Sequence, residues 1–465
     1  MDLSSAPPIL RVLYVAPECG PLVKTGGLGD VCGALPAALR QAGIDARVLV
    51  PGYPELLALR GEPLATVSAL GVEARLLAST MPDGGAPLLV LDCPQLYLRP
   101  GGPYQDAEGA NWPDNPLRFA FLAAVAALLC RPESPLDWRP HVLHCNDWQS
   151  ALAPLYLGRG APSVLTIHNL AFQGNFDSAL IGPLRLPPGE FNPEGYEFYG
   201  KVSFLKAGIV YADAVTTVSP TYAREIQTPE FGCGMEGILR KRSDVLAGIL
   251  NGIDVTVWNP ESDPYLKSAG KSANKVELQS RMGLERTDAP LFGAVGRMTH
   301  QKGTDLILAA APAIVEQGQL VVLGSGQREL EAAARELQRR FPGRVAVQVG
   351  FSEELAHLVE AGADFFLMPS RFEPCGLNQM YSQRYGTPPI ARATGGLADT
   401  VEDGVTGFLF REDLREGIAR ALACYRDPGA LRAMRRAGMS RDFSWSAAAR
   451  RYADLYQKLA TLQPA

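Results

Sequence analysis

Two stretches of the sequence place adjacent glycines where a helix is expected to begin. "KTGGLGDV" carries Lys24 just before Gly26 and Gly27, and "ATGGLADTV" carries Gly395 and Gly396. Glycine permits positive φ and close approach of the backbone to a ligand, and the unpaired N–H groups at a helix start attract anions or sugar oxygens. Neither the GxxxxGK[ST] nor the GxGxxG pattern is present, so kinase and dehydrogenase functions lose their main support. We interpret both turns as ligand cups, with a plain strand-to-helix turn as the alternative for the first.

A third stretch, "GRMTHQKG", places two cations in one loop after a predicted strand. Arg297 and Lys302 are five residues apart there. Each charge-assisted hydrogen bond to a phosphate contributes ~1.5–3 kcal/mol, so together they could hold a diphosphate and stabilise it as it leaves. Solvated surface charge is the alternative. With a glycine cup in each half of the chain, the pattern favours a ligand that contacts both halves.

Three further polar side chains follow predicted strands. Glu373 comes after "DFFLMP" and can accept hydrogen bonds from sugar hydroxyls, although a capping or ion-pairing role is equally open. His168 ends "SVLTIH", and Asp147 ends "HVLHCND", where a helix N-cap is the alternative. Cys375 has no histidine in its segment, so packing is a more common role for it than nucleophilic catalysis.

The elements that must position these residues form a repeating pattern. Short runs rich in Val, Ile and Leu, each followed by a turn and a helical pattern, indicate parallel βαβ units, and ligands of such folds bind at the carboxyl ends of the strands. We predict an α/β protein with two doubly wound, Rossmann-like domains facing across a cleft. The expected domains are 1–248 and 249–445, followed by a helix over 446–465 that could dock back on the first domain. The predicted strands are RVLYVAP, ARVLVPGY, HVLHCND, SVLTIHN, AVTTVSP, LFGAVGRM, QLVVLGSG, VAVQVGF, DFFLMP and PPIARATGG.

Composition excludes several other classes of protein. The 465 residues contain 49 acidic and 44 basic side chains without a basic block, so no nucleic acid partner is expected. The longest apolar run, 119–130, is shorter than the ~20 residues of a membrane span and predicts a buried helix. No signal peptide is recognisable, which predicts a cytoplasmic protein. The eight cysteines lack CxxC spacing, and most should be free thiols in packed positions. His141 and His144 fall on opposite faces of a strand, so we expect no metal site there.

Taken together, the motifs resemble those of bacterial glycogen synthases and plant starch synthases. "KTGGLGDV", "HCNDW", "TIHNLAFQG", "FLKAGIVYADAVTTVSPTYA", "NGID", "QKG", "SRFEPCGL" and "TGGLADTV" occur in the order of that family, from about residue 10 to about residue 445. The resemblance implies a GT-B fold and a retaining glycosyltransferase without metal or other cofactor. It also implies ADP-glucose as donor and the nonreducing end of an α-1,4-glucan, glycogen or a maltooligosaccharide, as acceptor. The acceptor would bind mainly to the first domain and the donor mainly to the second.

The resemblance also assigns roles to individual residues. The groups expected at the reaction centre are His168, Arg297, Lys302 and Glu373. Those expected to bind substrate are Lys24, Gly26, Gly27, Asp30, Asp147, Asn251, Cys375, Gly376, Leu377, Thr394, Gly395, Gly396 and Leu397. Asn378 stands where the family commonly has Thr, and Gln149 stands where it often has His. The detailed contacts of these two positions with the donor and acceptor are therefore not predicted. A UDP-glucose-dependent transferase, a sugar-nucleotide epimerase and a non-catalytic glucan-binding protein are the alternatives.

Overall fold

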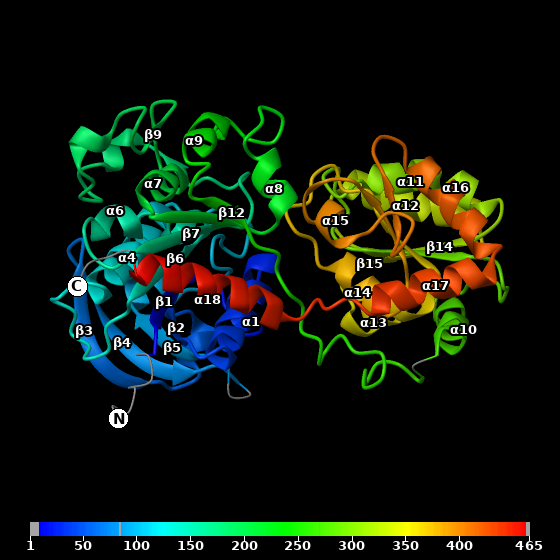
Figure 1. Cartoon of the computed structure of the whole chain (residues 1–465), viewed down its shortest axis with the longest axis horizontal. Helices are drawn as coiled ribbons and strands as arrows, with labels where there is room; N and C mark the ends of the chain where they lie inside the picture. The colour runs from blue at the N-terminus through cyan, green and yellow to red at the C-terminus, as the bar shows by residue number, and fades with distance from the viewer. Residues whose placement is uncertain (1–8, 83–84, 269, 462–465) are drawn as a thin grey trace, which may run out of the picture. The chain divides into compact units, whose positions relative to one another are not determined.

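The computed structural model describes residues 9–82, 85–268 and 270–461. They form two compact units. Unit 1 contains the described residues up to Val218, then Ala223–Gly252 and the residues from Trp445 onward, and unit 2 contains Ser219–Tyr222 and Ile253–Ser444. Each unit is built around its own sheet, coloured blue to green and green to orange respectively (Figure 1). The expected assignment of one substrate to each domain stays a prediction.

A nine-stranded sheet organises unit 1, in the order β12-β11-β7-β6-β1-β2-β5-β4-β3. Its first seven strands run parallel, and β4 and β3 form an antiparallel edge. The strands are β1 Arg11–Val15, β2 Asp45–Pro51, β3 Glu62–Ala69, β4 Val72–Thr80, β5 Pro87–Asp92, β6 Val142–Asn146, β7 Ser163–Ile167, β11 Ala214–Thr217 and β12 Leu246–Gly248, and a separate small sheet contains β8 Asn175–Phe176, β9 Glu197–Phe198 and β10 Lys201–Ser203. Five of these strands, β1, β2, β6, β7 and β11, are the ones the sequence predicts.

The helices of unit 1 include the buried helix predicted from the apolar run. That helix, α4, is buried along most of its length. The helices are α1 Gly27–Gln41, α2 Pro54–Leu57, α3 Pro94–Tyr97, α4 Asn115–Leu129, α5 Asp147–Ser150, α6 Ala153–Leu157, α7 Phe204–Tyr211, α8 Pro220–Glu225, α9 Glu236–Lys241 and α18 Trp445–Thr461, with 3-10 turns at Ser178–Leu180 and Pro188–Glu190. The first three residues of α8, Pro220 to Tyr222, cluster with unit 2.

The last helix, α18, packs on the first unit beside α1 and β6 (Figure 1). Its Tyr456 hydroxyl lies 2.6 Å from Nδ1 of the buried His144, whose Nε2 lies 2.6 Å from the hydroxyl of Thr166. His141, three residues earlier, accepts a hydrogen bond from the backbone N–H of Arg11 at 3.1 Å. The two histidines therefore have separate structural partners, and His144 helps to hold the C-terminal helix on unit 1.

Unit 2 is a parallel sheet of six strands in the order β15-β14-β13-β16-β17-β18, with helices on both faces (Figure 1). One apolar cluster includes residues of α11, α12 and α16, and a second includes residues of α10 and α13, so each face has its own core. The strands are β13 Leu291–Val295, β14 Gln319–Gly324, β15 Val345–Val349, β16 Phe365–Met368, β17 Pro389–Arg392 and β18 Phe408–Phe410. The helices are α10 Lys271–Arg281, α11 Thr304–Val315, α12 Arg328–Arg340, α13 Glu353–Gly362, α14 Asn378–Arg384, α15 Gly395–Thr400, α16 Leu414–Tyr425 and α17 Pro428–Met439.

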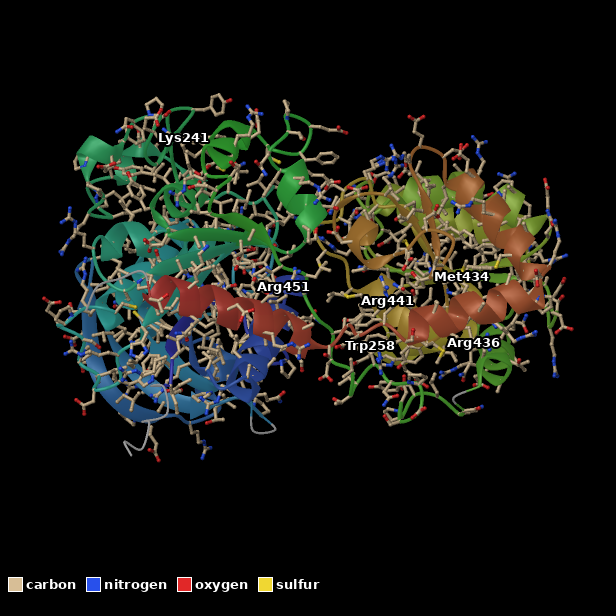
Figure 2. All side chains as sticks on the ribbon, viewed as in Figure 1. Lys241, Trp258, Met434, Arg436, Arg441 and Arg451 are labelled. Atoms are coloured by element: carbon tan, nitrogen blue, oxygen red, sulfur yellow. The ribbon has the colours of Figure 1, made fainter. Side chains whose placement is uncertain are left out.

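The segment that enters unit 2 after Gly252 is fixed by aromatic stacking. The Trp258 ring, labelled in Figure 2, lies 3.8 Å from the rings of both His357 and Tyr381, at 10° to each. Asp263 accepts a 2.6 Å hydrogen bond from Nδ1 of His357. This segment is therefore an ordered part of unit 2 and not a free linker.

Three expectations from composition can be compared with the described residues. All eight cysteines are free thiols, and most are packed as predicted: five are buried, Cys130 and Cys424 are half-buried, and Cys233 is exposed. Within the described ranges, no helix combines the length and apolar character that crossing a bilayer requires. The same ranges contain no group of three or more His, Cys, Asp or Glu side chains arranged to hold a metal ion.

Candidate active site

Lys302 and Glu373 form a close ion pair in unit 2. Lys302 Nζ lies 2.5 Å from Glu373 Oε2, and the Ser370 hydroxyl donates to the same oxygen at 3.0 Å. The Glu373 side chain is only 6% exposed, whereas that of Lys302 is 29% exposed. Both residues follow strand ends of the parallel sheet, β13 and β16, so the topology explains why residues 71 positions apart meet. A buried carboxylate thus holds a cation that solvent and ligands can still reach.

Arg297 lies on the loop after β13 and is exposed. Its neighbour Met298 is buried, and that residue's N–H donates to the carbonyl of Ser325 at 2.9 Å. The carbonyl of Met298 accepts from Gln327 N–H at 2.8 Å. The loop after β14 therefore fixes the backbone on which Arg297 stands, while its guanidinium stays accessible.

The second glycine turn packs directly on the backbone of the Glu373 segment. Gly395 has φ of +44°, and a Cβ there would lie 1.9 Å from the carbonyl oxygen of Glu373. A Cβ on Gly396 would lie 2.1 Å from the carbonyl oxygen of Cys375, and Gly396 N–H donates to Glu373 O at 3.1 Å. Only glycine fits at either position. Thr394 precedes the turn as the N-cap residue of α15, and Leu397 is fully buried behind it.

The "EPCGLN" turn is organised by its own hydrogen bonds. Cys375 is buried, and Gly376 takes φ of +73°. Gln379 Nε2 donates to the carbonyl oxygens of both residues at 3.0 Å. Leu377 is the N-cap residue of α14, and Asn378 Nδ2 donates to Val295 O at 2.8 Å. Asn378 thus ties this turn to the end of β13, next to the Arg297 loop.

In unit 1 the first glycine turn is fixed by Glu18, a residue that was not predicted from the sequence. Glu18, buried just after β1, accepts hydrogen bonds from Thr25 N–H at 2.7 Å and from the Thr25 hydroxyl at 2.6 Å. Lys24 Nζ pairs with Asp30 at 2.7 Å, with side chains 48% and 34% exposed. The loop therefore presents Lys24 on a rigid base, with its charge partnered by a carboxylate in the first turn of α1.

The first glycine turn does not use the positive φ that glycine permits. Gly26 has an extended φ of −171°, and Gly27, the first residue of α1, is not among the glycines with positive φ. A Cβ on either would meet no described atom within 4 Å. Close backbone packing that requires glycine occurs instead at Gly33 within α1, where a Cβ would lie 2.1 Å from the carbonyl oxygen of Gly20. Gly26 and Gly27 thus leave open space at a helix start that has no side-chain cap.

Asp147 and His168 meet at the strand ends of unit 1. Asp147 takes φ of +54°, and its Oδ1 accepts the backbone N–H of His168 at 2.7 Å. His168 Nε2 lies 3.0 Å from Asn146 Oδ1, while Asn146 Nδ2 donates to Val15 O. Because that amide oxygen is an acceptor, Nε2 carries the imidazole proton, and Nδ1 is the acceptor of the ring.

Burial shifts the pKa values of both groups. It lowers the pKa of His168 to about 3, so the imidazole is neutral at physiological pH. It raises the pKa of Asp147 to about 7, against the opposing effect of hydrogen bonds from the backbone N–H groups of His168 and Asn169. A neutral His168 is suited to hydrogen bonding and packing, not to supplying charge.

Two other residues have less defined surroundings. Asn251 is half-buried after β12, near the end of unit 1. Gln149, in α5, is buried, and its Oε1 has no hydrogen-bond partner among the described residues.

The structure therefore brings together three sets of expected residues. Lys302 and Glu373 meet the Gly395–Gly396 turn in unit 2, Asp147 meets His168 in unit 1, and Lys24 meets Asp30 in unit 1. Glu18, Asn146 and Ser370 support these sets and were not predicted. Asn146 and Ser370 lie inside the motifs "HCNDW" and "PSRFEP", which could have identified them. Glu18 follows its strand outside the quoted motifs, so nothing in the sequence indicated its role.

The chain is similar in sequence to known proteins along most of its length. The family described as starch synthase catalytic domain matches residues 11–241, and glycosyl transferases group 1 matches residues 289–426. A glycogen synthase of Aromatoleum aromaticum is 52% identical over 477 residues, covering 96% of each chain. A glycogen synthase of Nitrosospira multiformis is 50% identical over 485 residues, covering 97% of this chain and 98% of the relative. The chain belongs to the glycogen synthase family.

Solved structures agree with membership of the glycogen synthase family. The catalytic domain of starch synthase IV from Arabidopsis thaliana, bound to ADP and acarbose, has a TM-score of 0.83 at 31% identity and covers 97% of this chain and 100% of its own. Sucrose-phosphate synthase of Thermosynechococcus elongatus has a TM-score of 0.62 at 20% identity, which supports the fold alone. The predicted GT-B fold and the predicted glycosyltransferase activity are confirmed.

Proposed function

We propose that this glycogen synthase family member transfers glucose from ADP-glucose to the nonreducing end of an α-1,4-glucan, with retention of configuration. The starch synthase IV relative that carries ADP supports the choice of donor. Glycogen and maltooligosaccharides are the proposed acceptors, and the cytoplasm is the proposed location. No nucleic acid partner is proposed, because the chain has a formal net charge of −5 and no basic block.

In the proposed reaction the bond between glucose C1 and the diphosphate oxygen breaks. A bond from C1 to the glucan O4 forms on the same face of the sugar, and the departing phosphate accepts the O4 proton. Arg297 and Lys302 stabilise the charge that develops on the diphosphate, since preorganised charge at a leaving group lowers the barrier most when it is strongest in the transition state. Lys24 and the open helix start at Gly26 and Gly27 supply further positive potential to the donor.

The remaining groups position the sugar. Glu373 accepts hydrogen bonds from glucosyl hydroxyls, and Gly395, Gly396 and Leu397 form the turn against it. His168, neutral and fixed by Asn146, stands beside the reacting glucosyl unit, and Asp147 fixes the backbone of His168. Asp30, Asn251, Cys375, Gly376, Leu377 and Thr394 contribute to substrate binding.

The observation that carries this proposal is the Lys302–Glu373 pair. The Lys302 ammonium is held at 2.5 Å by the Glu373 carboxylate, which is itself buried. A bound diphosphate would give Lys302 a second anionic partner. The Glu373 carboxylate could then accept hydrogen bonds from sugar hydroxyls. The same two side chains would thereby serve the leaving group and the transferred group.

A donor panel tests the proposal. ADP-glucose and UDP-glucose are each incubated with maltotriose, and both product length and anomeric linkage are measured. Faster elongation with ADP-glucose and exclusively α-1,4 products are expected. Preference for UDP-glucose would overturn the donor assignment, and conversion of the sugar nucleotide without any longer glucan would instead indicate an epimerase.

A further inference from the structure

A pocket in unit 1 lies at the opposite edge of the sheet from the residues assigned to the reaction. It encloses about 620 Å³, and its lining includes Arg11, Arg40, Ile44, Asp45, Arg47 and His141. Arg11 is the first residue of β1, and Asp45 is the first residue of β2. Asp147 and His168 instead follow the carboxyl ends of β6 and β7, which run parallel to β1. The pocket is therefore separate from the expected reaction site.

The lining of this pocket carries an excess of positive charge. Arg40 Nη1 lies 3.0 Å from Asp45 Oδ1, and Arg47 Nη2 lies 3.5 Å from Asp45 Oδ2. The same Oδ2 accepts a hydrogen bond from Trp138 Nε1 at 2.7 Å. One carboxylate can offset one of the three guanidinium charges, so two positive charges are left over among the lining residues.

Arg11 and His141 bring two hydrogen-bond donors close together. Burial and the Arg11 charge lower the pKa of His141, so its ring is neutral at physiological pH. His141 Nδ1 accepts the backbone N–H of Arg11 at 3.1 Å, which leaves the ring proton on Nε2. Nε2 lies 2.9 Å from Arg11 Nη2, and that atom is also a donor. An acceptor placed beside this pair would receive hydrogen bonds from both side chains.

Arg47 is held in place but is incompletely hydrogen-bonded. Its guanidinium carbon lies 4.4 Å from the centroid of the Trp138 ring, and this cation–π contact fixes the orientation of the side chain. Its Nε is buried and has no hydrogen-bond partner among the described residues, although buried polar groups nearly always have one. Because its contact with Asp45 is also long, Arg47 retains capacity to bind another anion.

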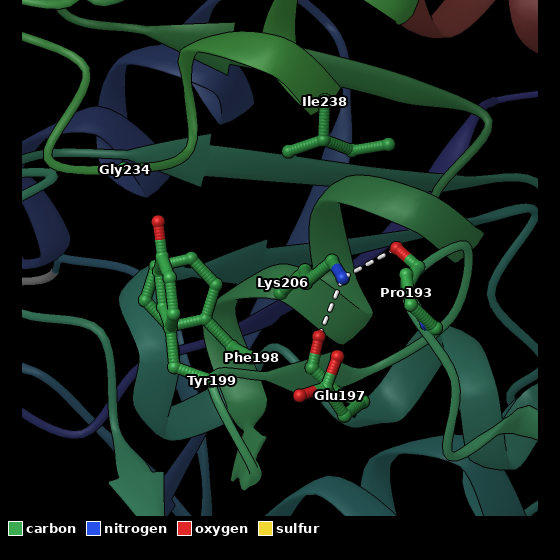
Figure 3. Close-up of a pocket in the computed structure, with 7 residues that line it drawn as sticks. All are labelled: Pro193, Glu197, Phe198, Tyr199, Lys206, Gly234 and Ile238. Atoms are coloured by element: carbon green, nitrogen blue, oxygen red, sulfur yellow. Dashed lines mark hydrogen bonds between the residues drawn. The ribbon is translucent and has the colours of Figure 1, made fainter.

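The pocket beside α7, drawn in Figure 3, lacks this excess of positive charge. The one cation among its lining residues is Lys206, which donates from Nζ to Pro193 O at 2.6 Å and to Glu197 O at 2.5 Å. The Glu197 side chain adds a negative charge to the same lining. Of these two pockets, only the one at Arg11 therefore favours an anionic ligand.

We infer that the pocket at Arg11 binds a phosphorylated small molecule, with its phosphate group held by Arg11, Arg40 and Arg47. Guanidinium groups match phosphate oxygens in pairs, and a phosphate oxygen would supply the acceptor that Arg11 and His141 lack. The volume lies within the ~300–1,000 Å³ typical of pockets for organic ligands, so a larger group can accompany the phosphate. Ile44 supplies apolar contact for that group. The net charge of −5 disfavours a nucleic acid as the source of the phosphate.

Titration with pyrophosphate in the presence of saturating ADP tests this inference, because ADP occupies the proposed donor site in unit 2. Isothermal titration calorimetry at constant ionic strength should show that the full-length protein still binds pyrophosphate. Arg11→Gln should weaken this binding by about tenfold or more, because one charged donor group is lost. The glutamine oxygen can accept the Nε2–H of His141, so folding should be preserved. Arg40→Gln, at an exposed position of α1, should have a similar effect.

The matched control is Arg159→Gln, which removes one positive charge from an exposed position of unit 1 outside the pocket lining. It should leave the affinity for pyrophosphate unchanged, and all three variants should bind ADP as the wild type does. Absence of pyrophosphate binding to the ADP-saturated wild-type protein would overturn the inference. Equal pyrophosphate affinities of Arg11→Gln and Arg159→Gln would also overturn it.

Discussion

The backbone of Glu373 accepts the N–H of Gly396 at 3.1 Å, while the side chain of the same glutamate holds Lys302 at 2.5 Å. One residue therefore connects the cation loop after β13 with the glycine turn that begins α15. Displacing either neighbour should therefore disturb the other.

Gly396→Ala should lower both stability and turnover. Its Cβ would lie 2.1 Å from the carbonyl oxygen of Cys375, and main chain cannot move aside without shifting Glu373. Overpacking of this kind costs ~1–3 kcal/mol in the free energy of unfolding, which urea titration measures. The control Gly237→Ala lies within α9 with no described atom within 4 Å of the added carbon, and it should be neutral or slightly stabilising. Equal behaviour of the two variants would contradict the account.

Glu373→Gln should separate donor binding from chemistry. Without the carboxylate, Lys302 has no anionic competitor, so ADP should bind as tightly as before or more tightly. Turnover should fall by ~10²-fold, because the hydrogen bonds to the transferred sugar lose their charge. Calorimetry with ADP and initial rates with ADP-glucose measure the two effects. Weaker ADP binding together with unchanged turnover would show that Glu373 does not hold the sugar.

The buried Asp147 should make the stability of unit 1 depend on pH. Its pKa is raised to about 7, compared with ~3.9 for an unfolded Asp, so the folded state binds the proton more tightly. Its contribution to stability is therefore complete below about pH 4 and is lost as pH rises to about 7. Asp147→Asn should gain stability relative to wild type over this interval, by up to about 1.4 kcal/mol per pH unit. A difference in unfolding free energy that is constant from pH 4 to pH 8 would exclude this effect.

His168 should remain neutral over the same range. Burial lowers its pKa to about 3, and Asn146 Oδ1 fixes the proton on Nε2. Nitrogen-15 NMR of the imidazole should show the Nε2–H tautomer without titration between pH 5 and pH 8. A titration midpoint near 6.5 would mean that the ring is solvated in solution.

Much of the fold follows from sequence because parallel strands buried on both faces are continuous apolar runs. β1, β7 and β16 are of this kind, and the sequence predicts them. The β3–β4 edge hairpin was not predicted. In β3 only Val67 is buried, and the alternation from Ala65 to Ala69 is short and contains one large apolar residue, so it is a weak signal for a strand. Its position depends on pairing with β4, which is a tertiary property.

Site residues could be predicted where a charged side chain follows a predicted strand. Residues that support the site from elsewhere in the sequence could not be predicted. Lys302 and Glu373 were identified by charge type and by their position after strands. Nothing local indicates that Glu18 holds Thr25, because a lone carboxylate after a strand is compatible with many roles. The sequence also does not show which property of glycine a turn uses, because Gly26 and Gly27 provide open space without positive φ.

The most direct test of the central claim is the turnover of Lys302→Ala with ADP-glucose and maltotriose, alongside its unfolding curve. If this ammonium stabilises the leaving diphosphate, turnover should fall by at least ~10²–10³-fold in a protein that still unfolds cooperatively. Near-normal turnover in the folded variant would contradict the claim.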